Sequence, residues 1–347
     1  MKTSDFSFHL PKNLIAQHPA SPRDHSRLLI VDRASGTLSH DYFYHLPHYL
    51  DSNDVLVVNN SRVVPFRLFG IRERRELRAK IEVLLLQEIR KGVWRALAYP
   101  LKKLQRGDII RFGKKERISF TVGKRTGEMI ELLTQLSKET LFRRLEKVGV
   151  MPTPPYIYEK LSSRKQYQTT FAKFSGSAAA PTAGLHFTKR VFNELARTGV
   201  QTLETTLHVG LGTFRPITEN HIEDHKIHSE RIFLDPKTAR SLTLAKKSDK
   251  KIIACGTTSL RTLESLTNKQ GIVRPTRKNG EDTSIFITPG YRFRCVDGLI
   301  TNFHLPQSTL FVLVSAFAGT KLMKQAYAEA VKKKYRFFSF GDAMLIL

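Results

Sequence analysis

The stretch from residue 181 to residue 230 concentrates side chains that could do chemistry. Imidazole gains and loses a proton near neutral pH, so a group of histidines can transfer protons or bind a metal ion. Glycine and threonine alternate with these groups, which indicates tight loops that let the backbone approach a ligand. Each histidine alone is typical of a solvated loop, but the whole cluster predicts a site. Five of the chain's twelve histidines lie in it, beside Glu223, Asp224 and Glu230: His186, His208, His221, His225 and His228.

The segment HIEDHKIHSE at 221–230 is the part of this cluster that could bind a metal ion. If it were helical, His221, His225 and His228 would share one face and could ligate a metal. The acidic pair between them could instead orient a histidine. Because the segment has no cysteine and is also compatible with a loop, we favour a role in proton transfer or hydrogen bonding and expect no bound metal.

The run KIIACGTTSLRTLE at 251–264 predicts a strand, a polar turn and a helix. The free N–H groups at a helix start, together with three hydroxyls, can receive a carboxylate, a phosphate or a ribose. Thr257 and Thr258 are the candidate contacts, and Arg261 could join them from the same side. Simple capping of the helix is the alternative interpretation.

Two further segments place polar side chains beside turns. Asn302 and His304 end a strand-like run before a proline turn, where they could read a base edge or a ribose, or satisfy the loop backbone. Asp342 follows a glycine turn, where a buried capping carboxylate is the ordinary interpretation and a catalytic one the alternative.

Several arginines occur where they could hold phosphate. Arg292 and Arg294 alternate with aromatic residues, which suits contact with single-stranded RNA, although an amphipathic edge strand would look similar. Arg62 and Arg67 lie at a predicted domain junction, where each could hold a phosphate or pair with a carboxylate.

The charge of the chain favours a polyanionic partner, with RNA or DNA first. There are 57 Lys and Arg against 31 Asp and Glu among 347 residues, a net charge of +26. Residues 61–150 hold 23 basic and 10 acidic residues, so about a quarter of the chain carries half of the excess. An ordinary charged surface is the alternative, but we favour a patch that faces nucleic acid.

The order of the predicted elements divides the chain. Six short β-rich runs lie between 62 and 133, at a spacing typical of a small antiparallel barrel. After 180, helices predicted at 189–199, 236–248, 258–271, 309–320 and 321–334 alternate with strands predicted at 200–209, 250–256, 284–290 and 335–347. This alternation predicts an α/β large domain of residues 1–60 and 151–347, with residues 61–150 inserted as a small antiparallel β-barrel.

Other classes of protein are disfavoured. Two cysteines, Cys255 and Cys295, form no disulfide framework, and the N-terminus has no apolar run, so we expect a cytoplasmic protein. The longest apolar run, at 310–319, is too short to cross a bilayer. The sequence also has no P-loop, no GxGxxG after an early strand, no HExxH and no CxxC motif.

Taken together, these motifs resemble the S-adenosylmethionine:tRNA ribosyltransferase-isomerase family of queuosine biosynthesis. The resemblance covers essentially the whole chain, from SDFSFHLPKNLIAQHPA at 4–20 through AAPTAGLHFT, LHVGLGTFRPI, IEDHKIHSE and GTTSLRTLES to LITNFHLPQSTLFVLVSAFAG and YRFFSFGDAM. The insert departs from the family pattern at ELRAKIEVLLL and at LAYPLKKLQRGD.

The resemblance implies a reaction. A 7-aminomethyl-7-deazaguanine at wobble position 34 of tRNAs with a GUN-type anticodon takes the ribosyl group of S-adenosylmethionine, giving epoxyqueuosine, adenine and methionine. S-adenosylmethionine would be a ribosyl donor, and no metal would be needed. The implied protein is a monomer without a membrane or an obligate protein partner.

The resemblance also marks positions for these roles. A base must remove the C5′ proton that the sulfonium acidifies, and the candidates are His186, His208 and His225. Asp224, Glu223 or Asp342 could protonate the departing adenine. The expected contacts to S-adenosylmethionine or deazaguanine are Thr182, Gly184, Gly210, Gly212, Thr257, Thr258, Arg261, Asn302 and His304. The expected tRNA contacts are Arg62, Arg67, Lys102, Lys103, Arg292 and Arg294.

Two rival functions compete with this one. A non-catalytic tRNA-binding protein would need only the basic insert, and leaves the histidine cluster and the GTTS turn unexplained. A methyltransferase that uses S-adenosylmethionine would carry a glycine-rich loop after its first strand, and the N-terminal third of the sequence has none.

Overall fold

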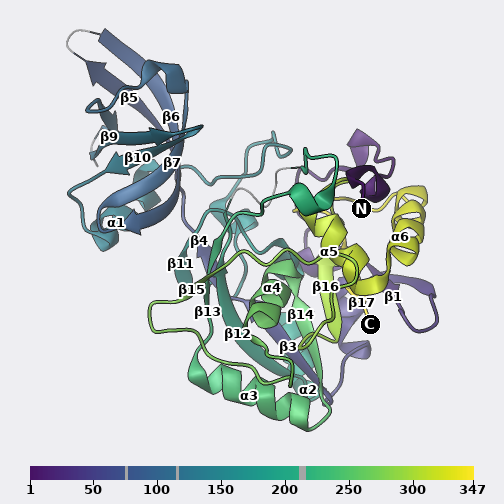
Figure 1. The fold of residues 1–347 in the computed structure, drawn as a ribbon. Helices are drawn as coiled ribbons and strands as arrows, with labels where there is room; N and C mark the ends of the chain where they lie inside the picture. The colour runs from purple at the N-terminus through teal and green to yellow at the C-terminus, as the bar shows by residue number, and fades with distance from the viewer. Residues whose placement is uncertain (75–76, 115–116, 211–215) are drawn as a thin grey trace. The chain divides into compact units, whose positions relative to one another are not determined.

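A nine-stranded mixed sheet organises the larger part of the chain (Figure 1). The computed structural model describes residues 1–74, 77–114, 117–210 and 216–347. The chain divides into a larger unit, Met1–Arg62, Pro154–Phe174 and Ala180–Leu347, and a smaller unit, Val63–Thr153 and Ser175–Ala179. The roles predicted for domains 1–60 with 151–347 and 61–150 stay predictions.

The sheet brings the carboxyl ends of four strands to one edge. Its order is β15 (Glu281–Thr283), β13 (Glu230–Phe233), β12 (Gln201–His208), β3 (Asp54–Asn59), β14 (Lys251–Cys255), β16 (Gly298–Asn302), β17 (Ala343–Ile346), β1 (Arg27–Val31) and β2 (Leu38–Tyr42). Strands β12, β3, β14 and β16 are parallel to one another. In open α/β sheets, ligands bind at the carboxyl ends of such strands.

Helices pack against this sheet because each has an apolar stripe to bury. The α-helices of the larger unit are α2 (Lys189–Arg197), α3 (Pro236–Lys247), α4 (Gly256–Leu266), α5 (Thr309–Ala318) and α6 (Thr320–Lys332). Its 3-10 helices are η1 (Thr3–Phe6), η2 (Lys12–Leu14), η3 (Arg23–His25), η4 (Phe43–His48), η6 (Arg164–Tyr167), η7 (Thr182–His186) and η9 (Ile222–Asp224). Helix α4 contacts five strands of the sheet, and Asp235 caps α3 through its side chain.

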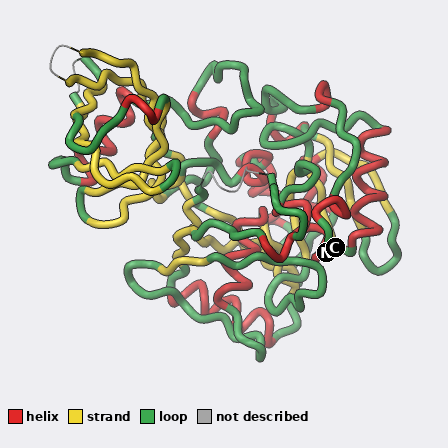
Figure 2. Tube along the Cα trace, turned by 45° about the horizontal axis from the view of Figure 1, so that its top comes forward, coloured by secondary structure: helices red, strands yellow, loops and turns green. Residues whose placement is uncertain are grey.

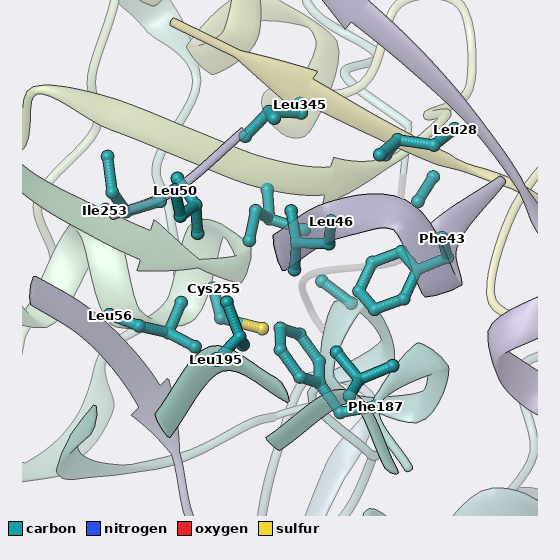
Figure 3. Packing of buried hydrophobic residues seen from close by; sticks show 14 of the residues in the cluster. Leu28, Phe43, Leu46, Leu50, Leu56, Phe187, Leu195, Ile253, Cys255 and Leu345 are labelled. Carbon is teal, nitrogen blue, oxygen red and sulfur yellow. The ribbon is translucent and has the colours of Figure 1, made fainter. Parts of the chain in front are cut away.

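A buried cluster joins the sheet to η4, η7 and α2 (Figure 3). Alternate residues of the strands point into it, as the period of two requires, and Leu56 and Ile253 are examples. The rings of Phe43 and Phe187 meet edge to face at 4.9 Å. Because η7 ends at His186, this packing fixes the segment that carries one of the predicted site residues.

The smaller unit is a closed six-stranded barrel, which confirms the barrel predicted from six short runs (Figure 2). Its strands follow one another around the barrel as β10 (Met129–Leu133), β7 (Val93–Tyr99), β6 (Leu77–Arg90), β5 (Arg67–Arg74), β8 (Ile109–Phe112) and β9 (Ile118–Thr126). Helix α1 (Lys138–Val148) packs Phe142 against Trp94 and Phe66. The short helix η5 (Leu101–Lys103) follows β7, and β4 (Ser61–Val63) pairs with β11 (Phe174–Ser177) in a separate two-stranded sheet.

The strand predicted at 284–290 is wrong. Strand β15 ends at Thr283, and the chain then runs irregularly to Gly298. The carbonyl of Ile285 accepts a hydrogen bond from Arg261 Nε at 3.2 Å, so a side chain takes the place of a neighbouring strand. Another side chain, that of Glu264, accepts the backbone N–H groups of residues 294–296. Buried polar side chains in α4 therefore hold this segment without a ladder.

Candidate functional site

A cavity lies in the larger unit at the carboxyl edge of the parallel strands. Segments that follow β12, β14 and β16 line it, together with the start of η7 and the loop before β17. Its polar lining comes from Tyr156, Thr182, Thr257, Thr258, Thr301, Asn302, His304, Ser308 and Ser339. Five of the predicted contacts thus come together there: Thr182, Thr257, Thr258, Asn302 and His304.

The N-terminus of α4 forms one wall of this cavity. Gly256 begins the helix with a φ of +85°, a left-handed conformation that glycine adopts without steric cost. No side chain caps the helix, and the Ser259 hydroxyl donates back to the carbonyl of Cys255 at 2.8 Å. Thr258 Oγ1 is buried without a hydrogen-bond partner among the described residues. This wall therefore offers free N–H groups and a hydroxyl to a ligand.

Asn302 is fixed from behind by two hydrogen bonds. Its Nδ2 donates to His186 Nε2 at 3.2 Å and to the carbonyl of Phe338 at 3.0 Å. The proton of the neutral imidazole is therefore on Nδ1, which donates to Ser26 Oγ at 2.7 Å. Asn302 is only 3% exposed, and its Oδ1 has no partner among the described residues.

Both histidines near the cavity are neutral. Burial, together with the positive charges of Arg336 and Arg23, lowers the pKa of His186 to about 3. Burial alone lowers the pKa of His304 to about 3. His304 shares a hydrogen bond of 2.8 Å with Thr301 Oγ1, and its backbone N–H donates to Tyr327. Neither ring carries a positive charge near neutral pH.

An unusual backbone conformation shapes the aromatic wall. Phe338 has a φ of +71°, which is uncommon for a bulky residue and concentrates at functional sites. Its ring stacks on Tyr156 at 4.4 Å, and the Tyr156 hydroxyl lies 2.8 Å from Ser339 Oγ. The following turn needs Gly341, since a Cβ there would lie 2.5 Å from the carbonyl oxygen of Arg336.

Asp342 anchors the loop that precedes β17. Its carboxylate accepts the backbone N–H groups of Arg27 and Arg336, at 3.1 and 2.9 Å. It also pairs with the Arg336 guanidinium at 3.0 Å, and its side chain is 2% exposed. These contacts use the carboxylate in positioning the loop, and it does not line the cavity. The acid role predicted for Asp342 stays a prediction.

Other predicted residues lie near this edge without lining the cavity. Arg261 forms a buried ion pair with Glu230, whose other carboxylate oxygen accepts the N–H of Gly210 at 3.1 Å. Gly184 packs beneath, where a Cβ would come within 2.7 Å of the Phe171 ring. His208 ends β12 with its ring against Phe233 at 5.7 Å. Gly212 lies outside the described residues.

The segment 221–230 does not form the helix on which metal binding depended. Only η9, at Ile222–Asp224, is helical, and Asp224 is exposed. His225 Nδ1 lies 2.9 Å from Glu219 Oε2, and this hydrogen bond lowers the pKa of Glu219. Across the part of the chain that the structure describes, no group of three or more His, Cys, Asp or Glu side chains is placed to hold a metal ion.

The predicted tRNA contacts are found in both units. Lys102 and Lys103 are exposed on the barrel, whereas Arg67 pairs with Glu82 at 3.2 Å. Arg62 is exposed on β4. Arg292 and Arg294 are exposed in the larger unit, and the backbone N–H of Arg294 is held by Glu264.

Sequence reasoning missed several residues of the cavity. Tyr156, Phe338 and Ser339 line it but were not among the candidates. Ser26, which bonds His186, was not a candidate either. Tyr156 lies in the proline-rich connector and Phe338 in the aromatic run before Asp342, so both motifs were visible. Nothing in the sequence pattern pairs residues 182 positions apart, and only the fold brings these two rings together.

Comparison with known proteins agrees with this architecture. Residues 3–346 match the model of a family described as queuosine biosynthesis protein. The chain belongs to this family. A relative from Symbiobacterium thermophilum, named S-adenosylmethionine:tRNA ribosyltransferase-isomerase, is 49% identical over 100% of both chains. One of the same name from Caldanaerobacter subterraneus subsp. tengcongensis is 47% identical, again over 100% of both.

A solved structure extends the likeness to three dimensions. The crystal structure of an S-adenosylmethionine tRNA ribosyltransferase from Thermotoga maritima is 35% identical, with a TM-score of 0.55, and the match covers 99% of this chain and 100% of that one. These findings confirm the family resemblance, the fold class and the assignment of the chain as a transferase of queuosine biosynthesis. Within the described residues, no helix is long and apolar enough to span a membrane.

Proposed function

We propose that this chain transfers and isomerises the ribosyl group of S-adenosylmethionine onto 7-aminomethyl-7-deazaguanine at position 34 of tRNA. The bonds from the ribosyl group to adenine and to the methionine sulfur break, while a carbon–nitrogen bond forms to the aminomethyl nitrogen and a carbon–carbon bond closes the five ribosyl carbons into a ring. The C5′ carbon and the amine each lose a proton; adenine takes up one, and the other is released. The products are epoxyqueuosine in tRNA, adenine and methionine. The names of the relatives support tRNA and S-adenosylmethionine as the substrate classes.

The observation that carries this proposal is the cavity at the carboxyl edge of β14 and β16. It combines stacked aromatic rings, the uncapped start of α4 and the unpartnered atoms Asn302 Oδ1 and Thr258 Oγ1. An apolar cleft with a few convergent polar groups is typical of a small-molecule site. The N-terminus of α4, with Thr257 and Thr258, adds uncharged hydrogen-bonding groups to this lining.

Proton transfer needs a base that can reach the substrate. Of the three candidate histidines, His208 lies one residue before Val209, which lines the cavity. His225 is bonded to Glu219, and His186 is bonded through both ring nitrogens. Because its neighbour in the chain lines the cavity, we assign the removal of the C5′ proton to His208.

The experiment is a product analysis with the full chain. The protein is incubated with S-adenosylmethionine and tRNA that carries the aminomethyl-deazaguanine at position 34, and mass spectrometry follows adenine and the modified base. We expect adenine and epoxyqueuosine in equal amounts, and neither with tRNA that carries guanine at that position. A methylated base with S-adenosylhomocysteine would establish a methyltransferase instead, and tRNA binding without any product would establish a binding protein.

A further inference from the structure

The cavity presents one buried acceptor whose orientation is fixed by the protein. Both N–H groups of the Asn302 amide are used by His186 Nε2 and the Phe338 carbonyl. The amide therefore cannot rotate to exchange its oxygen and nitrogen without losing both bonds. Asn302 lines the cavity, and Oδ1 is its one remaining polar atom. An acceptor buried in this way costs stability unless a ligand donates to it.

The lining selects against a charged ligand group at this place. Among the described residues, no Asp, Glu, Lys or Arg side chain lines the cavity. An aminomethyl group is cationic in water, and burying it without a carboxylate would be costly. The methionine part of S-adenosylmethionine carries both charges. Adenine is a neutral, planar base that carries no cationic substituent, and its exocyclic amine is a hydrogen-bond donor.

We propose that this cavity holds the adenine of S-adenosylmethionine, with the exocyclic amine donating to Asn302 Oδ1 and the ring packed against Phe338 and Tyr156. Ser26 and His186 are then positioning residues, because they act on the substrate only through Asn302. This assignment rests on the proposed function for the identity of the substrate. It adds that the protein recognises the purine by whether the group at C6 is a hydrogen-bond donor or an acceptor.

The test compares two ligands that differ in the base alone. S-adenosylhomocysteine and S-inosylhomocysteine share the ribose and the amino acid, but the second has a carbonyl in place of the amine. Isothermal titration of the full wild-type chain is expected to show binding of the inosine compound at least about tenfold weaker, because two acceptors then face each other. Equal affinities, or no binding of S-adenosylhomocysteine at millimolar concentration, would overturn the assignment.

Variants identify the residue that discriminates. We expect Asn302→Ala to bind both compounds within about twofold of each other. His186→Ala should lose most of the discrimination, and His186→Gln should restore part of it, since the Gln amide oxygen can accept from Asn302. Ser315→Ala is the matched control, because Ser315 Oγ in α5 is also buried without a partner among the described residues but does not line the cavity. Full discrimination in a folded Asn302→Ala variant would contradict the proposal.

The product analysis separates this inference from the proposed function. If the chain discriminates between the two compounds but releases no adenine from S-adenosylmethionine in the presence of tRNA, the adenine pocket is supported and the proposed reaction is excluded. Release of adenine by a wild-type chain that binds both compounds equally would keep the reaction and remove the pocket.

Discussion

The cavity of the larger unit and the surface of the barrel differ in their content of charged side chains. No charged side chain among the described residues lines the cavity, whereas residues 61–150 carry 23 basic residues against 10 acidic ones. A neutral enclosure strengthens each hydrogen bond made in it. A basic surface attracts a polyanion over long range, and this attraction weakens as the salt concentration rises. Under the proposed function, this contrast would separate selection of the small substrate from affinity for tRNA.

The barrel also exposes aromatic rings in a pattern that suits bases. Phe69 on β5 and Tyr99 on β7 both pair with Glu82 on β6, so the three side chains share the outer face. Phe69 is 58% exposed and Tyr99 is 74% exposed. Lys80 lies on the same face, two residues along β6. Aromatic rings beside basic groups are typical of surfaces that stack unpaired bases.

The largest expected effect follows from His186→Ala. Without the ring, Asn302 loses one of its two fixed bonds, and misplacement of a substrate contact can reduce the rate by about 100-fold. We expect kcat/KM for S-adenosylmethionine to fall by at least that factor, while the Kd for tRNA from filter binding stays within about twofold. A large loss of tRNA affinity with unchanged turnover at saturation would break the separation between cavity and barrel.

Acid should destabilise the larger unit through the same neutral cavity. The pKa values of His186 and His304 are about 3 in the folded chain, below the ordinary value of 6.5. The unfolded chain therefore binds protons between about pH 6.5 and pH 3 that the folded chain does not. The free energy of unfolding falls as pH falls through this window, by up to about 1.4 kcal/mol per pH unit for each histidine.

Denaturant titrations across this pH window check that slope. His186→Gln and His304→Gln should each reduce it by up to about 1.4 kcal/mol per pH unit, and each variant serves as the control for the other. A slope unaffected by both would mean that the cavity tolerates charge.

The aromatic pair on the barrel gives the next smaller effect. We expect Tyr99→Ala or Phe69→Ala to weaken tRNA binding by about tenfold, because stacking of one base contributes about 1–3 kcal/mol. The KM for S-adenosylmethionine should not change. Tyr158→Ala is the control, since Tyr158 is 79% exposed in the larger unit. An equal loss in that variant would show that exposed rings outside the barrel contribute as much.

The smallest effect concerns two lysines and appears mainly as a salt dependence. Lys102→Ala combined with Lys103→Ala removes two exposed charges from η5. The slope of log affinity against log salt should become shallower by about 1 to 2, with a loss of only a few-fold near physiological salt. An unchanged slope would mean that these lysines do not contact phosphate.

The fold was largely predictable because its signals are local. Six β-rich runs with short connections predict a small barrel, and alternation of helices and strands predicts the α/β unit. The error at 284–290 arose because a buried side chain of α4, that of Arg261, bonds the carbonyl of Ile285 in place of a strand partner. Local patterns cannot show such long-range replacements.

The site was predictable only in part. Thr257, Thr258 and Asn302 follow strands, so their place at the sheet edge could be expected. The environment of His186 could not, because its partners Ser26 and Asn302 lie 160 and 116 positions away. That environment keeps the ring neutral near neutral pH, and the role of His186 as a base stays a prediction. The roles of Asp224 and His225 stay predictions.

The position of β17 in the sheet has a consequence for biosynthesis. Strand β17 is made after every other strand of this sheet, yet it lies between β16 and β1. Until residues 343–346 leave the ribosome, β1 and β2 have no partner that joins them to the rest of the sheet. Before that point the nascent chain lacks the strand that connects the two parts of the sheet, and a ribosome stalled before this strand would carry a finished barrel beside an incomplete sheet.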